Sequence, residues 1–590
     1  MRLGVDTGGT FTDLVTGDGE IVKVPSTPED PGVAVRTAIT LAGATEAAVL
    51  AHGTTVATNA LLERRGARVA LFATEGFADE IEIARQARPS LYDPFADRPE
   101  PLVGRADRHD VRGRLDGDGV ERTPVAIDAL DALDDGVEAV AVSLLHSDRN
   151  QAHERAVAEH LRGRGLDVTC SHEISPEFRE YERTVTTVAN AYLRPACRAY
   201  LGALDELADE ALVMTSAGGL VPASASAAVP AALLLSGPAG GARAAAAIAI
   251  ECGYADAVAF DMGGTSTDVC LILAGAPALA AQRTIAGFPI RLPALDIHTI
   301  GAGGGSIAWI DAGGALRVGP RSAGAAPGPA CYGRGGREAA VTDADLLLDR
   351  IPADHAFPGL GVLDRDAAQR ACDRAGVTPE GIVAVVDAAM EQAVRLVTVE
   401  RGVDPRRLAL VAFGGAGPLH ACAIAAALGV PAVIVPPRAG VLSAVGLLCA
   451  PRRREVVRSV GVGGVDAARI AAVDSARELA GDGARLTTAF DCRYAGQSHE
   501  ITVPSVSSFH AEHERRNGFR RDGVAVEVVA VRAAAERPAP LAVTDLRAVE
   551  RQPIAGPAVV AEADCTVFAP AGWRGAVGPL GTWILTRGPS

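Results

Sequence analysis

The sequence predicts an α/β protein with two similar halves that face each other across a cleft, followed by a smaller α+β region. Three observations support this fold class: a repeated glycine-containing octapeptide, an alternation of apolar strands with helical stretches, and a third glycine-rich turn late in the second half. Alternation of strands and helices is typical of α/β domains. The repeat is the strongest of the three because both copies have the same local setting.

The octapeptide Asp6–Asp13 (DTGGTFTD) returns as Asp261–Asp268 (DMGGTSTD), with six of the eight positions identical. Each copy lies between two short apolar runs, which predicts a strand, a glycine turn and a second strand in both places. A repeat at so large a separation indicates a duplicated domain rather than a solenoid. We therefore expect two hairpins facing each other across the interdomain cleft, where ligands commonly bind.

The residues of these hairpins are typical of a site that binds both a phosphate group and a metal cation. Two glycines allow a sharp turn and close approach of a ligand, and consecutive N–H groups with threonine hydroxyls can cradle a phosphate. The nucleotide-binding candidates are Thr7, Gly8, Gly9, Thr10, Thr12, Gly263, Gly264, Thr265, Ser266 and Thr267. The catalytic carboxylates are Asp6, Asp13, Asp261 and Asp268, with Asp6 and Asp261 as the candidates to hold Mg²⁺. The simpler alternative, that Gly-Gly-Thr only closes a hairpin, is weakened by the second copy.

Length, composition and charge limit the classes of protein to which this chain can belong. A chain of 590 residues exceeds one hydrophobic core, so about two to four domains are expected. The net charge of −16 argues against a broad nucleic-acid surface. No apolar run approaches roughly 20 residues, and no leader-like segment opens the chain, so we expect neither a membrane span nor export. Ten cysteines without a Cys-x-x-Cys pair favour reduced thiols in a cytoplasmic protein.

Lys23 is the only lysine among 56 basic residues, and it lies on a predicted early strand. A P-loop needs a lysine after its glycine-rich run, and the sequence has no such run. Phosphate charge is therefore expected to be met without lysine, by backbone N–H groups, a metal and arginine. The sequence also lacks the Gly-x-Ser-x-Gly and His-Glu-x-x-His motifs, which argues against serine hydrolases and zinc proteases.

We expect residues 1–172 to form the first α/β half, 173–455 the second half, and 466–590 the smaller α+β domain. The arginine-rich stretch 452–465 is expected to be a solvated linker. Residues 308–337 are rich in Gly, Pro and Ala, which predicts an ordered excursion over a site, because long loops are usually functional or disordered.

The third glycine element is Gly414-Gly415-Ala416-Gly417, which follows a strand and precedes a helix. Glycines at such a junction let a sugar or base lie close to the backbone. We expect this turn to be the adenosine wall of a nucleotide site. Because glycine-rich strand–helix turns are common, an ordinary turn is the alternative.

Further polar residues are candidates for the acceptor side. Asp296 and His298, two apart on an extended segment, are expected to share a face, which suits an acid/base pair or a metal pair. Gly303 and Gly304 would bring backbone N–H groups near the substrate. The alternative is a buried histidine satisfied by a nearby carboxylate. His52 lies at a turn before a helix whose N-terminus would attract an anion. Arg183 is expected to form a surface ion pair within its own helix.

In this order the motifs resemble the A subunit of the hydantoinase/5-oxoprolinase family. The resemblance is specific from residue 1 to about 451 and weaker beyond, where the stretch between Arg532 and Gly556 is shortened. The segments that carry it are Asp6–Asp13, His52–Glu63, Ile174–Arg183, Ser236–Gly241, Asp261–Asp268, His298–Ser306, Val341–Asp343 and Phe413–Pro418.

The resemblance implies a duplicated actin-like (ribonuclease H-like) ATPase fold, with ATP and Mg²⁺ bound in the cleft. It implies ATP-dependent hydrolysis of a cyclic amide, such as 5-oxoproline, a hydantoin or a related lactam, through phosphorylation of the carbonyl oxygen. It also implies a hydantoinase B-type partner subunit, with the A subunit as a homo-dimer within a hetero-oligomer. On this basis Asp296, His298 and either His52 or Asp343 would line the acceptor side or hold a second divalent metal.

Three other functions remain open at this point. The chain is expected to be an A-type subunit of an ATP-dependent ketone carboxylase if its acceptor is a ketone, or a small-molecule kinase if the phosphorylated product is stable. A non-catalytic, actin- or chaperone-like ATP-binding scaffold would need a polymer or client surface, and the sequence shows no sign of one.

Overall fold

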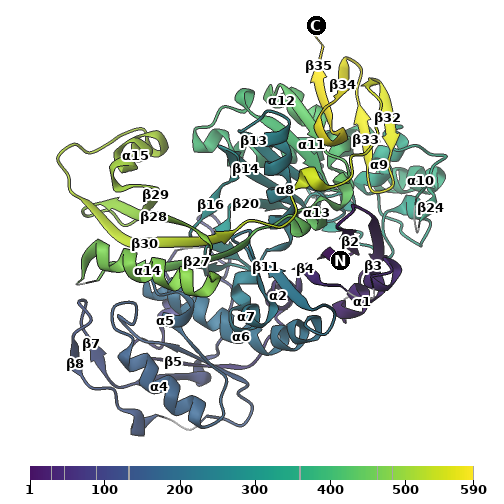
Figure 1. The fold of residues 1–590 in the computed structure, drawn as a ribbon. Helices are drawn as coiled ribbons and strands as arrows, with labels where there is room; N and C mark the ends of the chain where they lie inside the picture. The colour runs from purple at the N-terminus through teal and green to yellow at the C-terminus, as the bar shows by residue number, and fades with distance from the viewer. Residues whose placement is uncertain are drawn as a thin grey trace.

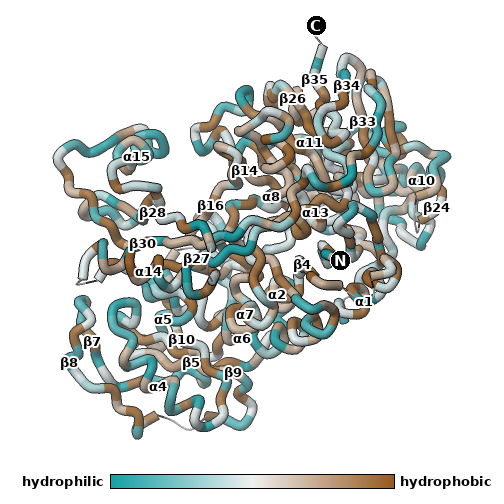
Figure 2. The backbone as a smooth tube through the Cα atoms, in the orientation of Figure 1, coloured by the Kyte–Doolittle hydropathy of each residue, from teal (hydrophilic) through white to brown (hydrophobic). Residues whose placement is uncertain are grey.

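The computed structural model describes residues 1–27, 30–44, 47–87, 89–130, 133–357, 360–461, 463–481 and 483–588. Two large sheets and a four-stranded sheet are covered by helices, so the predicted α/β class is confirmed (Figure 1). Hydrophobic residues line the strands and helices of the interior (Figure 2). Among the described residues, every helix falls short of the length and apolar character that a bilayer-spanning segment requires.

The first large sheet contains the first octapeptide hairpin. In space its N-terminal strands follow the order β3-β2-β1-β4-β11. Strand β1 is antiparallel to β2 and parallel to β4, which is parallel to β11. The bounds are β1 (Arg2–Thr7), β2 (Phe11–Thr16), β3 (Ile21–Pro25), β4 (Val49–Thr54) and β11 (Glu210–Met214).

The second large sheet repeats this arrangement around the second hairpin, with the order β15-β14-β13-β25-β26. Strand β13 is antiparallel to β14 and parallel to β25, which is parallel to β26. The bounds are β13 (Ala257–Met262), β14 (Thr267–Leu273), β15 (Ala276–Pro277), β25 (Ala409–Phe413) and β26 (Ala432–Val435). Strands β25 and β26 are buried throughout, which explains their unbroken apolar sequences.

Helix α13 (Leu442–Leu448) joins the two halves by packing against both β1 and helix α8 (Gly237–Glu251). Glycines make this approach possible. A Cβ on Gly4 would lie 2.3 Å from the Ala444 carbonyl oxygen, and a Cβ on Gly446 would lie 1.8 Å from that of Gly240. The N-terminal hairpin is thereby held against the second half.

A four-stranded sheet, in the order β10-β9-β5-β6, forms a separate layer below the first large sheet in Figure 1. Its strands are all parallel, and the long helix α6 packs on it. The bounds are β5 (Val69–Thr74), β6 (Arg108–Val111), β9 (Ala139–Ser143), β10 (Val168–Cys170), α4 (Ala152–Gly163) and α6 (Glu180–Leu204).

The residues after 451 add strands to both large sheets. The first sheet reaches ten strands through β12 (Leu220–Pro222), β27 (Arg452–Ser459), β30 (Val526–Arg537), β28 (Arg485–Tyr494) and β29 (Ile501–Val503). The second sheet gains β35 (Trp583–Arg587), β34 (Trp573–Val577) and β31 (Ile554–Ala555), with β35 antiparallel to β26. The domain boundaries at 172, 455 and 466 stay predictions.

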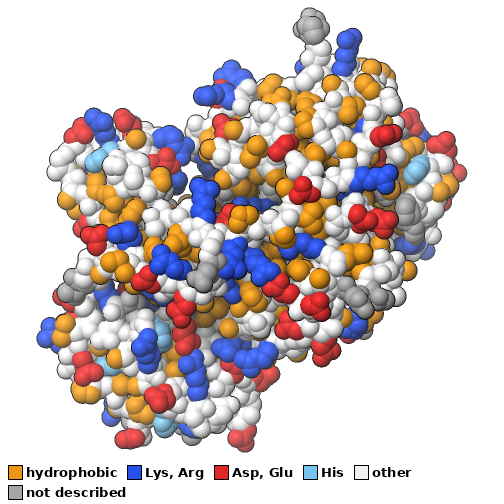
Figure 3. Space-filling view, in the orientation of Figure 1, with side chains coloured by type: hydrophobic (Ala, Val, Ile, Leu, Met, Phe, Trp, Pro, Cys, Tyr) orange, Lys and Arg blue, Asp and Glu red, His pale blue; other side chains and the backbone are white. Residues whose placement is uncertain are grey.

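The prediction of a linker at 452–465 is wrong, because residues 452–459 form β27 between β12 and β30. Two of its arginines form ion pairs with carboxylates. Arg452 forms an ion pair with Glu210, and Arg453 lies 3.0 Å from Glu455 and 3.2 Å from Glu536. Lys and Arg side chains gather across the middle of the visible face, where Figure 1 places β27 (Figure 3).

The Gly/Pro/Ala-rich stretch predicted as an ordered excursion contains a hairpin, β21 (Ser306–Ile310) and β22 (Leu316–Ser322), and a 3-10 turn, Ala330–Tyr332. The remaining helices are α1 (Pro31–Leu41), α2 (Val56–Leu62), α3 (Glu80–Ile83), α5 (Ser171–Ile174), α7 (Ala223–Ala228), α9 (Val341–Leu347), α10 (Arg365–Ala375), α11 (Pro379–Val397), α12 (Gly417–Leu428), α14 (Gly464–Ala480) and α15 (Phe509–Asn517). The remaining strands are β7 (Arg114–Leu115), β8 (Glu121–Thr123), β16 (Leu279–Ala280), β17 (Arg283–Ile285), β18 (Phe288–Ile290), β19 (Ala294–Leu295), β20 (Ile297–Ile300), β23 (Ala356–Phe357), β24 (Gly361–Val362), β32 (Ala558–Ala561) and β33 (Thr566–Ala569).

Candidate functional site

Four aspartates occupy matching positions in the two octapeptide hairpins. Asp6 lies directly opposite Asp13 across β1 and β2, and Asp261 lies directly opposite Asp268 across β13 and β14. The charges of Asp6 and Asp13 contribute to raising the pKa of Asp261, which belongs to the other hairpin. The carboxylates of the two hairpins are therefore within electrostatic reach of each other across the junction of the halves.

These carboxyl groups are partly exposed, yet protein atoms surround them closely enough to hinder their ionisation. Burial, then the charge of Asp13, raises the pKa of Asp6 to about 7. Burial raises that of Asp268 to about 6, and burial together with Asp268 raises that of Asp261 well above its ordinary value. Burial and like charges both disfavour the ionised form of a carboxyl group. A cation bound among these groups would reverse that effect.

The turn of the first hairpin is braced by the residues that follow β3. The Ser26 hydroxyl donates to the Gly8 carbonyl over 2.7 Å, and the Ser26 N–H donates to the Thr10 carbonyl over 3.0 Å. The Ser26 and Thr12 hydroxyls lie 3.1 Å apart. Ser26 was missed by sequence reasoning because no local motif marks it. Its position beside the turn depends on the path that the chain takes after β3.

The glycine run near 303 lies against the turn of the second hairpin. The N–H groups of Gly304 and Gly305 donate to the carbonyls of Gly263 and Gly264, over 3.0 and 2.6 Å. A Cβ on Gly303 would lie 2.7 Å from backbone atoms of the turn, so only glycine fits without a shift. Thr342 secures the same run by donating from both its N–H and its hydroxyl to the Gly304 carbonyl, each over 2.8 Å.

The third glycine element also reaches the second hairpin. The N–H of Ala416 donates to the Met262 carbonyl over 3.0 Å. Gly414 has a positive φ of 80°, and a Cβ there would lie 2.3 Å from a carboxylate oxygen of Asp261. The turn Gly414–Gly417 and the N-terminus of α12 thus lie directly beside Asp261, and the role of this turn as an adenosine wall stays a prediction.

Lys23 is part of the first hairpin site, although sequence reasoning gave it no role there. Its ammonium lies 2.7 Å from a carboxylate oxygen of Asp13. The expectation that phosphate charge is met without lysine did not include this contact. The pairing of β2 with β3 aligns Lys23 with Asp13, and this register depends on the turn between those strands. The only signal in the sequence was that the single lysine lies on the strand next to the motif.

The structure does not bring Asp296 and His298 to the four aspartates. On β20, Thr299 is opposite Asp268 and its hydroxyl donates to that carboxylate, whereas His298 is opposite Val269. Because neighbouring residues of a strand point to opposite faces, His298 and Asp296 face away from Asp268. Asp296 instead forms an ion pair with Arg401. Burial, then the charges of Arg401 and Arg283, lowers the pKa of His298.

His52 and Asp343 have packing roles in place of the acceptor or metal roles considered for them. The buried His52 ring lies 3.1 Å from the Val5 carbonyl and 2.7 Å from the Tyr200 hydroxyl, so both its nitrogens are engaged. Burial lowers its pKa to about 4. The buried Asp343 carboxylate accepts from the N–H groups of Ala330, Cys331 and Ala340, which fixes the start of α9.

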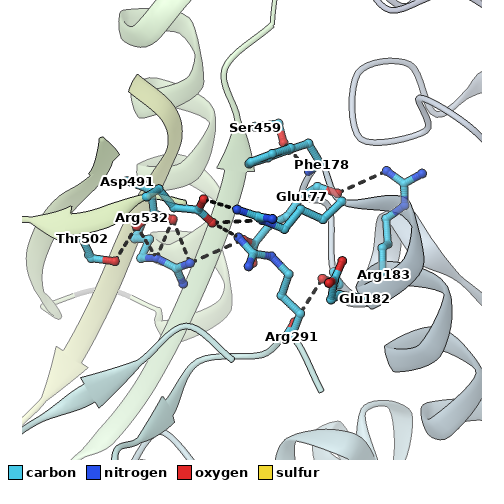
Figure 4. A network of polar contacts seen from close by, with 12 residues as sticks. Glu177, Phe178, Glu182, Arg183, Arg291, Ser459, Asp491, Thr502 and Arg532 are labelled. Carbon is cyan, nitrogen blue, oxygen red and sulfur yellow. Dashed lines mark hydrogen bonds and ion pairs between the residues drawn. The ribbon is translucent and has the colours of Figure 1, made fainter. Parts of the chain in front are cut away.

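Arg183 is not on the surface, which corrects the expectation of an exposed pair within its helix. Only 1% of the residue is exposed. Its guanidinium lies 2.9 Å from Asp148, outside the helix, and donates to the Leu144 carbonyl. It also donates to the Glu177 carbonyl (Figure 4). The helix start packs against the four-stranded sheet, which removes Arg183 from solvent.

A buried charge network connects the segment before α6 to the strands added after residue 451 (Figure 4). Arg532 on β30 lies 2.8 Å from Asp491 on β28 and 3.4 Å from Glu177. Arg291 lies 2.7 Å from the same Glu177. These four charged side chains are almost fully buried.

The sheets and the paired hairpins define a two-sheet α/β protein with a carboxylate-lined site at the junction of its halves. A family model described as the hydantoinase/oxoprolinase N-terminal region matches residues 2–165, and one described as hydantoinase/oxoprolinase matches residues 183–456. The chain belongs to the hydantoinase/oxoprolinase family.

Relatives within and around this family include enzymes of two kinds. The caprolactamase subunit alpha of Pseudomonas jessenii is 34% identical over 100% of this chain and 99% of its own length. The crystal structure of the ATP-dependent caprolactamase from that organism superposes with a TM-score of 0.85 over 100% of both chains, at 32% identity. The acetophenone carboxylase gamma subunit of Aromatoleum aromaticum is 34% identical over 75% of this chain and 67% of its own. The 5-oxoprolinase 1 of Arabidopsis thaliana is 34% identical over 76% of this chain but only 41% of its own length.

Proposed function

We propose that this chain is the A-type subunit of an enzyme that uses ATP to hydrolyse a cyclic amide. The observation that carries the proposal is the pairing of two near-identical hairpins whose aspartates act on one another across the junction. The family supports the reaction class, because relatives are named as a caprolactamase subunit and a 5-oxoprolinase.

The arrangement of strands supports a duplicated, actin-like ATPase fold. Both halves have the same strand order and the same directions around their hairpins. In this proposal the turns at residues 7–12 and 263–267 hold the phosphates of ATP. The Gly414–Gly417 turn lies against the adenosine, where glycine backbone lets a nucleotide approach closely.

The residues present fit Mg²⁺. The site offers carboxylate oxygens, which are the ligands that Mg²⁺ takes together with water and phosphate. Asp6 and Asp261 would hold the ion. Burial and then the charges of neighbouring aspartates raise the pKa values of both groups, and a bound cation would favour their ionised forms. When bound, the ion would neutralise charge on the phosphates.

The chemistry requires activation of the amide. A lactam carbonyl is a poor electrophile, and transfer of the terminal phosphoryl group of ATP to its oxygen gives an imidate-type phosphate that water attacks. Water adds at the former carbonyl carbon, and the ring C–N bond of this tetrahedral adduct breaks as the nitrogen takes up a proton. A second water hydrolyses the resulting acyl phosphate to the carboxylate and free phosphate. The chain's own residues would place the phosphoryl group in line with the carbonyl oxygen and neutralise its charge, which is most of the catalysis in such transfers.

We also propose that the chain acts with a hydantoinase B-type subunit, as a homo-dimer within a hetero-oligomer. The relatives named subunit alpha and gamma subunit support a multi-subunit assembly. The similarity to the acetophenone carboxylase gamma subunit favours a second candidate function, the ATP-dependent carboxylation of a ketone. Both reactions would begin with phosphorylation of a carbonyl or enol oxygen.

One experiment tests the proposal and separates the two functions. The chain is purified alone and with a candidate B-type subunit, and phosphate release from ATP is measured with lactams, hydantoins and ketones, with and without bicarbonate. We expect a lactam or hydantoin to stimulate release and to yield ADP, phosphate and the opened ring. A bicarbonate-dependent carboxylated ketone would support the second function, and a stable phosphoester would identify a kinase and refute both.

A further inference from the structure

We propose that Lys23 binds the terminal phosphate of ATP and is the cationic residue of the phosphoryl-transfer site. This inference rests on the proposed function and adds a residue that the octapeptide motif does not contain. A lysine ammonium is a compact point charge with three N–H donors, and such groups commonly bind phosphate.

The position of Lys23 follows from the register of the sheet. Lys23 is directly opposite Asp13, Asp13 is opposite Asp6, and Asp6 is beside Gly53 on β4. Cross-strand partners point to the same face of a sheet. The ammonium therefore lies on the face that carries the two hairpin carboxylates, at the end of a row that crosses four strands.

The contacts of Lys23 leave donors available. Its ammonium is 2.7 Å from one oxygen of Asp13, and its side chain is 31% exposed. The nitrogen lies 5.0 Å from the centre of the Phe11 ring, within the range of a cation–π interaction. Its charge also acts on Asp6 and on the half-buried Asp564, which accepts from the Gly440 N–H over 2.7 Å. One short contact to Asp13 leaves two N–H donors that could turn to an anion.

The two hairpins differ in the group that contacts the aspartate on the second strand. In the second hairpin the partner of Asp268 is the neutral Thr299 hydroxyl. Arg283 also acts on Asp268, but its guanidinium donates to the Ile297 carbonyl. The first hairpin thus holds an ammonium at the place where the second holds a hydroxyl. This asymmetry assigns the terminal phosphate, which carries the most charge, to the side of the first hairpin.

The competing explanation is that Lys23 only neutralises Asp13. Exposed ion pairs contribute little to stability, with typical values of about 0–1 kcal/mol. An ion-pair role predicts that bound nucleotide leaves the reactivity of the ammonium unchanged. A phosphate-binding role predicts that bound nucleotide shields the ammonium from chemical modification, and that ATP shields it more than ADP does.

Because Lys23 is the only lysine, its reactivity can be measured without ambiguity. The full chain is treated with an amine-acetylating reagent, and modification of Lys23 and of the chain's α-amino group is followed by peptide mass spectrometry. With Mg²⁺ and a non-hydrolysable ATP analogue we expect acetylation of Lys23 to slow by at least about tenfold, while ADP protects it much less. The α-amino group serves as the internal control. Equal Lys23 reactivity with and without the analogue would overturn the inference.

Binding calorimetry on three variants supplies the second test. Lys23→Met should weaken the ATP analogue by about 10- to 100-fold and ADP only slightly, since a hydrogen bond to a charged group is lost. Lys23→Arg should retain most of the affinity. Arg36→Met, which removes an exposed cation paired with Asp30 on the neighbouring helix, should bind like the unmodified chain. Normal affinity of Lys23→Met for the analogue would refute the role of Lys23 and leave the proposed function intact, whereas an unmodified chain that binds neither nucleotide would refute the proposed function itself.

Discussion

At the scale of single residues, burial and, at Asp6 and Asp261, repulsion between aspartates disfavour ionisation of the hairpin carboxyl groups. Burial raises the pKa values of Asp6, Asp261 and Asp268, and the aspartates of both hairpins add to the effect at Asp261. The pKa of Asp261 is therefore raised by carboxylates of both hairpins. Asp261 also lies against Gly414 of the third glycine element.

We predict that Asp261→Asn abolishes nucleotide turnover without damaging the fold. The substitution keeps the size of the side chain but removes the charge that would hold Mg²⁺ and orient the phosphates. We expect at least about a 100-fold loss of acceptor-stimulated phosphate release. The free energy of unfolding should stay the same or rise, because a neutral amide replaces a carboxyl group that burial and repulsion disfavour as an anion.

The matched control is Asp366→Asn, at an exposed position on α10, which should turn over ATP like the unmodified chain. Near-normal turnover by Asp261→Asn would contradict the role of the paired hairpins. Phosphate release and urea unfolding of both variants provide the two measurements.

The hairpins could be predicted from the sequence because each is formed by one short continuous segment, and the same motif occurs in two copies. The residues that support them could not be predicted in the same way. Ser26, Lys23 and Thr299 reach the hairpins only through strand register and chain return. Asp296 and His298 illustrate the same limit, since an i, i+2 pattern gives a shared face but not which face meets the site.

At the scale of elements, a buried histidine holds three helices together behind the third glycine turn. His420, in the first turns of α12, lies 3.2 Å from Asp345 on α9 and 2.7 Å from Asp387 on α11. Burial alone would lower the pKa of His420, but the two carboxylates outweigh it and raise the pKa to about 10. The imidazole is thus a fixed positive charge, and α9 also carries the Thr342 contact to Gly304.

We predict that His420→Gln lowers the free energy of unfolding by about 3–5 kcal/mol at pH 7, since it leaves buried carboxylates without their cation. The folded-state pKa lies above the ordinary value of 6.5, so the folded chain holds an extra proton between that value and about 10. The contribution of His420 is complete below about pH 6.5 and is lost as the pH rises through 10. Urea unfolding at pH 7 and 10 should therefore show a difference between the two chains that shrinks with pH. A difference that stays constant would contradict the charged state of His420.

The contact between α8 and α13 gives a second prediction at this scale. A Cβ on Gly446 would lie 1.8 Å from the Gly240 carbonyl oxygen, so Gly446→Ala must push the two helices apart. We expect a loss of about 1–3 kcal/mol in the free energy of unfolding, as is usual for overpacking. Affinity for ATP should fall as well, because α13 holds β1 and its Asp6 against the second half.

The control is Gly202→Ala, in the interior of helix α6, where an added Cβ meets nothing within 4 Å. Replacing a helical glycine by alanine at such a position stabilises a protein by about 0.5–1 kcal/mol. Equal effects of the two substitutions would show that the close approach of α8 and α13 is not needed. Urea unfolding and calorimetry measure both quantities.

The sequence could predict which segments are strands and helices through most of the two halves, but it could not predict the role of residues 452–459. Three consecutive arginines indicated a solvated linker. Two of them, Arg452 and Arg453, pair with Glu210 and Glu536, which are distant in sequence and become neighbours only once the ten-stranded sheet has formed. Pairing over such distances leaves no local pattern to detect.

At the scale of the whole molecule, the strands added after residue 451 tie the two halves together. Strand β30 pairs with β27 in the first sheet, and β35 pairs with β26 in the second. The network of Arg532, Asp491, Glu177 and Arg291 fixes the first of these connections (Figure 4). Glu177, Arg291 and the two strands that carry Asp491 and Arg532 are far apart in sequence, so the network joins three segments of the chain.

We predict that Arg532→Met destabilises this connection by about 3–5 kcal/mol, because Asp491 and Glu177 would remain buried without their shared cation. Burial already raises the pKa of Glu177, and loss of Arg532 removes a charge that lowers it. Protonation at lower pH relieves the unpaired carboxylates, so the deficit in unfolding free energy should be smaller at pH 5 than at pH 8. Arg485→Met, at an exposed position at the start of β28, is the control and should show neither effect. Hydrogen exchange should rise first in β28 and β30 while the β1–β2 hairpin stays protected. Uniform exchange across the molecule, or a deficit independent of pH, would contradict the role of the network in joining these parts of the chain.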